Sequence, residues 1–335
     1  MAGHDIVVLG GSAGGVEALK GIFGRLPRDF PAALFVVLHL SPTSRSVLPE
    51  LLSRAGNLPA RHPINEEAIR PGNVYVAPPD MHMLLRPGHV ILRRGPHENR
   101  TRPSIDPLFR SAAVAYRSRV IGVVLSGLLD DGSAGLVAIS ACGGICVVQQ
   151  PDDAIWPEMP RNALAHDHVH HTAPVAELPD LLSRLVQQPP GIMPPIPRHL
   201  IVESSIAAQE APIVPEPAQV GRPTRLSCPQ CGGVLNEVAE QGTMRFRCQI
   251  GHAFTAETLV AAQDEELERA LESALRTHRD RVVLFRRMQE KSEAQSLSHA
   301  AARWRAGADE SDHAAKVIAD AINNLRKPAD LEESR

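Results

Sequence analysis

Three residues that together could transfer an acyl group each lie just beyond a short apolar run of the sequence. Ser12 follows residues 6–9, His39 follows residues 34–38, and Asp131 follows residues 120–125 through a short turn. A serine hydroxyl needs a base to take its proton, and that base needs a group to orient it. A serine, a histidine and an aspartate therefore suit the roles of nucleophile, general base and orienting carboxylate.

The turn around Ser12 favours this chemistry but also allows a simpler interpretation. Residues 10–14 read Gly-Gly-Ser-Ala-Gly, which fits Gly-x-Ser-x-Gly, whereas the dinucleotide-binding pattern Gly-x-Gly-x-x-Gly lacks its middle glycine here. Small neighbours let the chain bend sharply at the start of a helix, where free N–H groups, with Ala13 and Gly14 as the candidates, can stabilise an oxyanion. Taken alone, a serine in such a loop is more often a helix N-cap.

The elements that must position these residues follow an alternating pattern. Five apolar runs are rich in β-branched residues and bounded by turn residues, as expected of buried strands: 6–9, 34–38, 74–77, 120–125 and 145–148. Between the first two, Val16, Leu19, Phe23 and Leu26 recur on one face of a helix. The pattern predicts an α/β fold with a doubly wound, mostly parallel sheet and helices on both faces. Ser12, His39 and Asp131 would then meet at the rim formed by the carboxyl ends of the strands.

Composition sets limits on function. The 335 residues are 43% hydrophobic and 22% charged, with a net charge of -3, and the basic residues form no block. We therefore expect a globular protein that does not bind nucleic acid. The sequence has no apolar run of membrane-spanning length and no signal peptide, so we expect no membrane span and a cytoplasmic location.

The chain is expected to contain four segments. Residues 1–186 form the α/β domain, and residues 187–224, with nine prolines and no aromatic residue, form an extended linker. Residues 225–254 form a compact cysteine-containing unit with a hairpin that turns at Gln241 and Gly242. Residues 255–335 form a helical tail with Thr255 as N-cap, a break at Gly307, and a last helix over residues 311–325.

The cysteine-containing unit has the spacing of a structural zinc site. Cys228 and Cys231 form a Cys-x-x-Cys knuckle, and Cys248 and His252 follow after a hairpin. Three thiolates and one imidazole complete a tetrahedral zinc site, and a unit this short has too little core to fold without a metal. The alternative is free thiols. Cys142 and Cys146 flank two glycines at a strand start and are predicted to be core residues.

Six segments together resemble one known family. These are GGSAGG (10–15), VLHLSP (37–42), VYVAPPDMHM (74–83), RPSIDPLF (102–109), VVLSGLLDDGSAG (123–135) and MPRNAL (159–164). Their order and spacing are similar to those in the catalytic domain of chemotaxis protein-glutamate methylesterases, the CheB family, over residues 4–186. The resemblance implies a Ser-His-Asp hydrolase that needs no cofactor for catalysis. Its substrates would be glutamyl γ-methyl esters on chemoreceptor cytoplasmic helices, with methanol released, and some members of the family also deamidate glutamine.

The resemblance implies roles for individual residues. Ser12 matches the nucleophile, His39 the general acid/base and Asp131 the orienting carboxylate, whereas Asp130 stands where the family commonly has asparagine. Ala13, Gly14 and Leu128 would form the oxyanion site and the wall of the substrate cleft, and this sequence departs from the family's usual residues at Ala13 and Leu128. Many members carry an amino-terminal receiver domain. Because the resemblance starts near Met1, we expect no gating by such a domain in this chain.

Other polar residues favour structural roles. His166, His168, His170 and His171 could bind a metal but are expected to be solvated. Asp80 with His82, and Arg102 with Asp106, match family motifs and are expected to anchor loops, cap helices or shape the cleft.

Two functions other than esterase stay open at this point. One is a non-catalytic signalling scaffold that retains the esterase fold and binds a protein partner through the zinc unit or the helical tail. The other is a nucleotide-binding protein.

Overall fold

The computed structural model describes residues 3–39, 41–43, 45–165, 168–210, 221–240 and 243–325. The chain divides into two compact units, Met1–Leu259 and Val260–Arg335. Four parts of the sequence predictions lie outside the described residues: His166, the turn at Gln241 and Gly242, residues 211–220 of the predicted linker, and residues 326–335 of the predicted tail.

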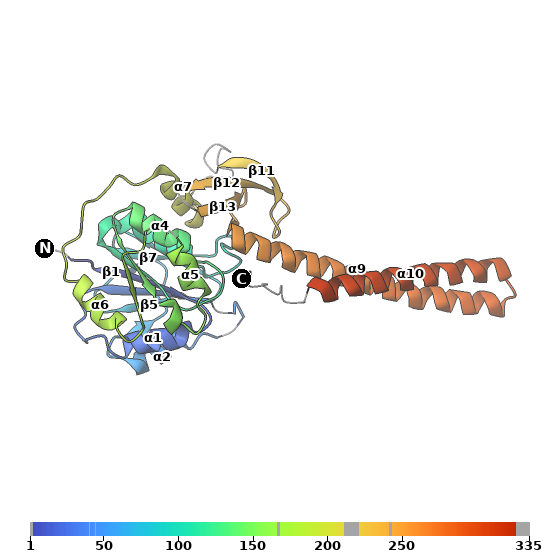
Figure 1. Ribbon diagram of the computed structural model, residues 1–335, viewed down its shortest axis with the longest axis horizontal. Helices are drawn as coiled ribbons and strands as arrows, with labels where there is room; N and C mark the ends of the chain where they lie inside the picture. The colour runs from blue at the N-terminus through green and yellow to red at the C-terminus, as the bar shows by residue number, and fades with distance from the viewer. Residues whose placement is uncertain are drawn as a thin grey trace, which may run out of the picture. The chain divides into compact units, whose positions relative to one another are not determined.

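The first unit is built on a seven-stranded sheet in the order β10-β9-β8-β1-β2-β5-β3, in which every neighbouring pair is parallel (Figure 1). The strands are β1 (Ile6–Gly11), β2 (Ala33–Leu38), β3 (Ala60–Arg61), β5 (Val74–Val76), β8 (Val120–Val124), β9 (Ile145–Gln149) and β10 (His171–Ala173). The chain leaves β1 toward β2 on one side and later returns to place β8 on the other side. The doubly wound α/β fold predicted from the sequence is confirmed, and its switch point lies between β1 and β8.

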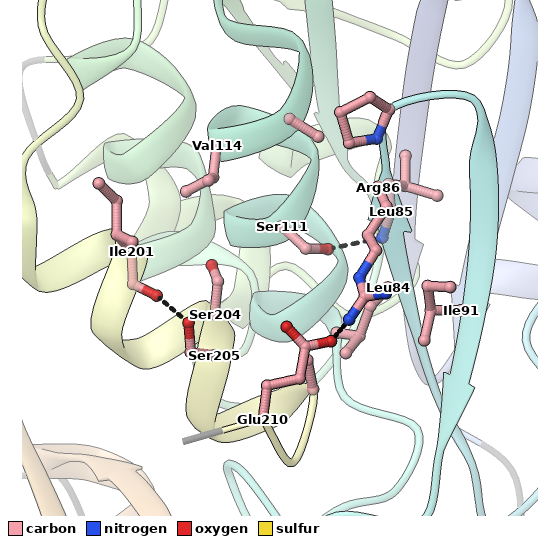
Figure 2. Close-up of a pocket in the computed structure, with 13 residues that line it drawn as sticks. Leu84, Leu85, Arg86, Ile91, Ser111, Val114, Ile201, Ser204, Ser205 and Glu210 are labelled. Carbon is pink, nitrogen blue, oxygen red and sulfur yellow. Dashed lines mark hydrogen bonds and ion pairs between the residues drawn. The ribbon is translucent and has the colours of Figure 1, made fainter. Parts of the chain in front are cut away.

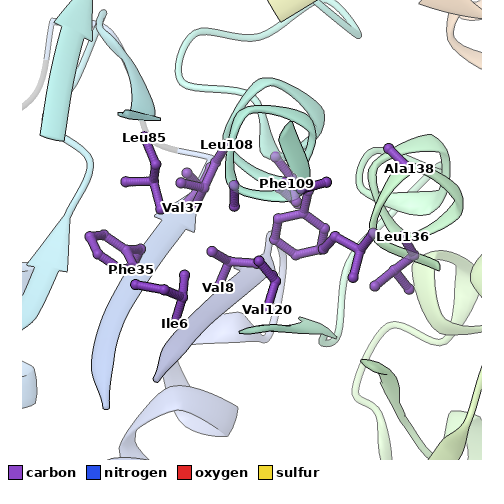
Figure 3. Close-up of a cluster of buried hydrophobic side chains, with 14 of the residues drawn as sticks. Ile6, Val8, Phe35, Val37, Leu85, Leu108, Phe109, Val120, Leu136 and Ala138 are labelled. Carbon is purple, nitrogen blue, oxygen red and sulfur yellow. The ribbon is translucent and has the colours of Figure 1, made fainter. Parts of the chain in front are cut away.

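Helices cover both faces of this sheet. Side chains of α1 (Gly15–Phe23), α2 (Leu48–Ala55) and α6 (Leu178–Leu185) pack in one apolar cluster with Val7 and Leu9 of β1. Those of α3 (Ile105–Tyr116), α4 (Ser133–Ala141) and α5 (Glu158–Leu164) pack in a second cluster with Ile6 and Val8. Figure 3 shows Phe109 of α3 and Leu136 of α4 over the strand residues of this second cluster. Successive side chains of a strand point to opposite faces, so one continuous apolar strand supplies both cores.

Two smaller sheets complete the first unit. An antiparallel sheet contains β4 (Glu67–Ala68), β6 (His82–Arg86) and β7 (His89–Arg93). The cysteine-containing unit is a four-stranded antiparallel sheet of β11 (Arg222–Ser227), β12 (Val234–Glu240), β13 (Thr243–Cys248) and β14 (Ala253–Thr255). Short 3-10 turns lie at Arg117–Arg119 and Pro151–Asp153.

The segment predicted to be an extended linker contains a helix, α7 (Arg198–Ala207). Leu200, Glu203 and Ala207 of this helix are buried, and Leu200 belongs to the apolar cluster beneath α3. The prediction of an extended linker was wrong here because it rested on the number of prolines in the segment. These prolines lie on both sides of a ten-residue stretch that has none and that forms α7.

The long tail helices differ from the prediction at one glycine. Helix α9 (Ala256–Ala294) begins after Thr255, whose hydroxyl accepts a hydrogen bond from the N–H of Thr258, so the predicted N-cap is confirmed. Helix α10 (Ser298–Leu325) runs through Gly307, where a break was expected. A Cβ at Gly307 would lie 3.0 Å from the ring of Phe285, so this glycine permits close contact between the two helices of the second unit. Among the described residues, no helix is long and apolar enough to cross a membrane.

Candidate active site

Ser12 and His39 come together because neighbouring strands of the sheet end at the same level. Gly11 of β1 pairs with Leu38 of β2 in parallel register, and the N–H of His39 donates to the carbonyl of Gly11. Ser12 and His39, the residues that follow this pair, therefore lie at the same carboxyl rim of the sheet. Among the described residues, no hydrogen bond joins the Ser12 hydroxyl to the His39 ring.

Asp131 reaches the same rim from the loop after β8. Its Oδ2 lies 2.7 Å from Nε2 of His39, and the aspartate side chain is 2% exposed against 17% for the histidine. An ionised carboxylate only accepts hydrogen bonds, so Nε2 carries the proton of a neutral His39 and Nδ1 keeps the lone pair. The nitrogen available as a base is therefore Nδ1.

Asp131 is held in place by a dense set of donors. Its Oδ1 accepts from Nδ2 of Asn99 at 2.8 Å and from the hydroxyl of Ser104 at 2.9 Å, and its Oδ2 accepts from the N–H of Ile105 at 2.8 Å. Ile105 is the first residue of α3, whose free N–H groups favour a negative charge. Burial alone would raise the pKa of Asp131, but the hydrogen bonds from His39, Ile105 and Asn99 outweigh it, and the pKa lies below its usual range.

Two further buried carboxyl groups lie close to Asp131 and behave differently. Burial raises the pKa of Asp130 to about 8, with the negative charge of Glu257 adding to the rise and a hydrogen bond from Thr255 opposing it. Burial and the charge of Asp131 raise the pKa of Asp106 to about 7. Of these three carboxyl groups, Asp131 is therefore the one that most favours the ionised form.

The turn after β1 is fixed by the loop after β8. The N–H of Ser12 donates to the carbonyl of Ser126 at 2.9 Å, and the hydroxyl of Ser126 donates to the carbonyl of Ala13 at 2.8 Å. Gly14 has φ 74°, and a Cβ there would lie 2.6 Å from the Ser126 hydroxyl. Gly14 is the N-cap residue of α1, so Ser12 lies before the cap position that the simpler interpretation gave it.

The part of the chain that contains Ser12, His39 and Asp131 matches a known protein family. A family model described as CheB methylesterase matches residues 7–182, more than half of the chain. The chain belongs to the CheB methylesterase family. It is therefore an ester hydrolase, as the six sequence segments predicted.

Individual relatives agree with this membership. A putative protein-glutamate methylesterase/protein-glutamine glutaminase of Leptospira interrogans is 35% identical over 185 residues, which are 55% of this chain and 96% of that protein. Another protein of this type, from Syntrophus aciditrophicus, is 34% identical over 54% of this chain and 52% of its own length. This chain thus spans about half the length of that relative. The CheB methylesterase catalytic domain of Thermotoga maritima is 30% identical, with a TM-score of 0.53, over 55% of this chain and all of that structure.

Several residues around the CheB site were missed by the sequence analysis. Asn99 and Ser104 hydrogen-bond Asp131, and a Cβ at Gly127 would lie 2.9 Å from that of Ser12. Asn99 lies in a loop that reaches the site only through tertiary contacts, so nothing in its local sequence marks it. Ser104 and Gly127 lie in two of the six family segments, but the segments alone do not indicate these contacts. Leu128, predicted to form part of the cleft wall, is 40% exposed at the rim.

The other polar residues matched to CheB motifs have structural partners. Asp80 accepts two hydrogen bonds from Arg102, and Nε2 of His82 bonds the carbonyl of Pro96. Asp106 accepts from the N–H groups of Gly132 and Gly135 at the start of α4. These contacts agree with loop anchoring and helix capping. Nδ1 of His170 accepts from the N–H of Cys146, and both Cys142 and Cys146 are buried in the core.

A pocket of about 250 Å³ lies away from the triad. It is bounded by β6, β7, α3 and α7, with Arg86 and Glu210 paired at its edge, and Figure 2 shows its lining. None of the predicted catalytic residues lines this pocket.

The four predicted zinc ligands form a compact cluster outside the segment matched to CheB. Sγ of Cys231 and Sγ of Cys248 lie 3.7 Å apart, and Nδ1 of His252 lies 3.7 Å from Sγ of Cys228 and 3.5 Å from Sγ of Cys248. All four donor atoms lie within 4.8 Å of one another. Zinc bonds of usual length in a tetrahedron give edges of about 3.8 Å between sulfurs and about 3.6 Å between sulfur and nitrogen. The donor set and its spacing therefore fit zinc.

Proposed function

We propose that this chain hydrolyses the γ-methyl esters of glutamyl side chains on the cytoplasmic helices of chemoreceptors, with Ser12, His39 and Asp131 as its catalytic triad. The observation that carries the proposal is the 2.7 Å bond between His39 and the buried, ionised Asp131, at the strand rim where Ser12 follows β1. The names of the curated relatives support the reaction and the type of substrate.

The first half of the reaction forms an acyl-enzyme. The Ser12 hydroxyl attacks the ester carbonyl while Nδ1 of His39 takes its proton, and Asp131 stabilises the imidazolium through Nε2. The same proton then passes to the departing methoxide, so methanol leaves and Ser12 carries the glutamyl group. Water repeats the cycle on the acyl-enzyme, which restores the free carboxylate and the serine.

The developing oxyanion needs donors close to Ser12. The N–H of Ser12 donates to Ser126 and that of Gly15 donates to the Ser12 carbonyl, so both are occupied. The N–H groups of Ala13 and Gly14 are the remaining donors of this turn, and in comparable hydrolases one such donor contributes about 3 to 4 kcal/mol. Leu128, exposed on the rim, would contact the substrate helix.

The same triad would deamidate glutamine. An amide carbonyl accepts the same attack, and His39 would give its proton to departing ammonia rather than to methanol. The double name of the curated relatives, methylesterase/glutaminase, supports this second activity.

Methanol release tests the main proposal. With a chemoreceptor cytoplasmic fragment that carries methylated glutamates, we expect the wild type to release methanol and Ser12→Ala to be slower by about 10⁴-fold or more. Ser183→Ala, in helix α6, is the matched control and should keep full activity, because the Ser183 hydroxyl bonds the carbonyl of Pro179 in its own helix. A wild type without activity that binds the methylated fragment tightly would support the scaffold function in place of the enzyme.

We also propose that Cys228, Cys231, Cys248 and His252 bind one structural zinc ion. The metal would hold together a small sheet that has few apolar side chains of its own. Metal analysis of protein purified under reducing conditions should find one zinc per chain. Cys231→Ser should lose it, and Cys142→Ala, a change to a cysteine buried in the core, should retain it. Wild-type protein without zinc would refute this site.

A further inference from the structure

The cysteine-containing sheet touches the support of the catalytic triad directly. Strand β14 starts at Ala253, immediately after the metal-ligand candidate His252. The Ala253 carbonyl accepts from the N–H of Asn99 at 2.8 Å, and the Ala253 N–H donates to the carbonyl of His97. Residues 97–99 thus run beside β14. Asn99, held in this way with φ 49°, is the residue whose Nδ2 bonds Asp131 and Asp106.

Two threonines at the end of β14 make a second connection. The Thr255 hydroxyl donates to Oδ1 of Asp130 at 2.8 Å, and the Thr258 hydroxyl donates to Oδ1 of Asn99 at 3.3 Å. Both threonines are buried, so water does not compete for these bonds. Asp130 and Asp131 are adjacent in the chain, but their side chains bond different partners. Asp130 bonds Thr255, and Asp131 bonds His39.

A buried charge cluster fixes the sheet in this position. Arg247 of β13 bonds Glu98 at 3.0 Å and Glu203 of α7 at 2.8 Å, and Arg245 bonds Glu203 at 2.9 Å. Arg110 of α3 bonds Glu98 at 2.8 Å, and each of these five side chains is at most 4% exposed. A buried ion pair holds its groups in one geometry, because moving one of them leaves an unpaired charge in the interior.

We propose that the cysteine-containing sheet positions the catalytic triad: Thr255 anchors Asp130, and β14 with Thr258 anchors Asn99, so that Asp131 is held against His39. This inference rests on the proposed esterase function. Its key residues Ala253, Thr255 and Thr258 lie outside the segment matched to CheB, and Asp130 stands where the sequence resemblance puts asparagine in the family. The residues that anchor Asp130 and Asn99 therefore come from a segment outside the catalytic domain that this chain shares with the family.

The charges around Asp130 agree with an anchoring role. Asp130 faces the Thr255 hydroxyl and the carboxyl groups of Glu257 and Asp106. Burial raises the pKa of Asp130 to about 8, so its side chain is a neutral acid at neutral pH, and without the threonine donor its buried Oδ1 would lose the hydrogen bond from Thr255. Loss of the hydroxyl should therefore move Asp130, and with it the backbone that carries Asp131.

Two substitutions at Thr255 and one control test the anchor in the full-length protein. Thr255→Val should lower kcat for methanol release by about tenfold and leave KM within about twofold, because a positioning defect affects the transition state more than substrate binding. Thr255→Ser, which keeps the hydroxyl, should restore kcat. Thr224→Val removes a threonine hydrogen bond to Leu235 in the same sheet and should behave as wild type. Equal kcat values in Thr255→Val and wild type would overturn the inference.

A double-mutant cycle separates anchoring from helix capping, which Thr255 also performs. If Thr255 acts through Asp130, Thr255→Val should cost much less in kcat when Asp130→Ala has already removed the acceptor. Equal costs in both backgrounds would show that the threonine only caps α9, and would overturn its role at the active site.

A measurement independent of activity follows the hydrogen bond itself. The proton between His39 and Asp131 should give a low-field proton NMR resonance that is absent in His39→Gln. We expect the resonance to shift or broaden in Thr255→Val and in protein stripped of zinc by a chelator, and to return when zinc is added. An unchanged resonance in both samples would refute the inference even if the esterase proposal holds. Wild-type protein that releases no methanol would refute the esterase proposal, and the resonance would still test the positioning.

Discussion

Two adjacent aspartates, Asp130 and Asp131, differ in environment more than their sequence shows. Asp131 accepts from a histidine, an asparagine, a serine and the N–H groups at the start of α3, which lower its pKa. Asp130 has one hydroxyl donor and two acidic neighbours, and burial raises its pKa to about 8. The family resemblance favoured Asp131 as the orienting residue, and the structure places that residue, not its neighbour, against His39.

Exchange of each aspartate for asparagine should separate their roles in catalysis. Asp131→Asn replaces an acceptor with a group that favours the wrong tautomer of His39, so kcat should fall by about 10⁴-fold. Asp130→Asn keeps an oxygen that accepts from Thr255, so kcat should fall by less than about tenfold. Methanol release by the two variants measures the difference. The opposite ranking would assign the triad to Asp130.

The raised pKa of Asp130 also predicts how stability depends on pH. The folded protein holds this proton up to about pH 8, whereas an unfolded chain releases it near pH 4, so the contribution is complete below about pH 4. It is lost progressively as the pH rises from about 4 to 8. Asp130→Asn lacks this dependence, so its thermal midpoint relative to wild type should rise across that range. A difference that stays constant from pH 5 to pH 8 would contradict the assignment.

At the level of elements, regular patterns could be predicted and long-range contacts could not. Strands β1, β2, β5, β8 and β9 of the parallel sheet follow from apolar runs, and the placement of Ser12, His39 and Asp131 at one rim follows from the parallel order of those strands. Helix α7 and the passage of α10 through Gly307 could not be predicted, because Glu203 pairs with arginines distant in sequence and Gly307 lies close to the ring of Phe285 in another helix. Asn99 was missed for the same reason, since its role depends on pairing with Ala253.

Helix α7 should be fixed mainly by its buried glutamate. Glu203→Gln removes a buried negative charge that both Arg245 and Arg247 bond, so the free energy of unfolding should fall by about 3–5 kcal/mol. Glu210→Gln removes a partly exposed pair with Arg86 just beyond the same helix and should change it by less than about 1 kcal/mol. Chemical denaturation of both variants checks the contrast. Equal effects would mean that the buried cluster does not fix α7.

At the level of the whole molecule, the family match and the compact units have different boundaries. The CheB match ends at residue 182, whereas the first compact unit continues to Leu259 and includes α7 and the cysteine-containing sheet. The added segments supply Glu203, Arg245 and Arg247 to a cluster whose other members, Glu98 and Arg110, lie within the match. Glu98 and Arg110 pair with each other within the match, and the later segments extend this pair into a larger buried cluster.

Two shortened chains should therefore behave differently. A chain that ends at Pro190 keeps the triad and the pair of Glu98 with Arg110, but it removes Arg247 from Glu98, Glu203 from Arg110 and Ala253 from Asn99. Its kcat for methanol release should fall by about tenfold or more, with a lower thermal midpoint. A chain that ends at Ala270 keeps α7, the zinc ligands, Thr255 and Thr258, and should keep the kcat of the full chain within about twofold. Full activity in the chain that ends at Pro190 would show that the family domain needs no support from the later segments. Loss of activity in both shortened chains, with zinc still bound to the longer one, would instead place an essential function in residues 271–335.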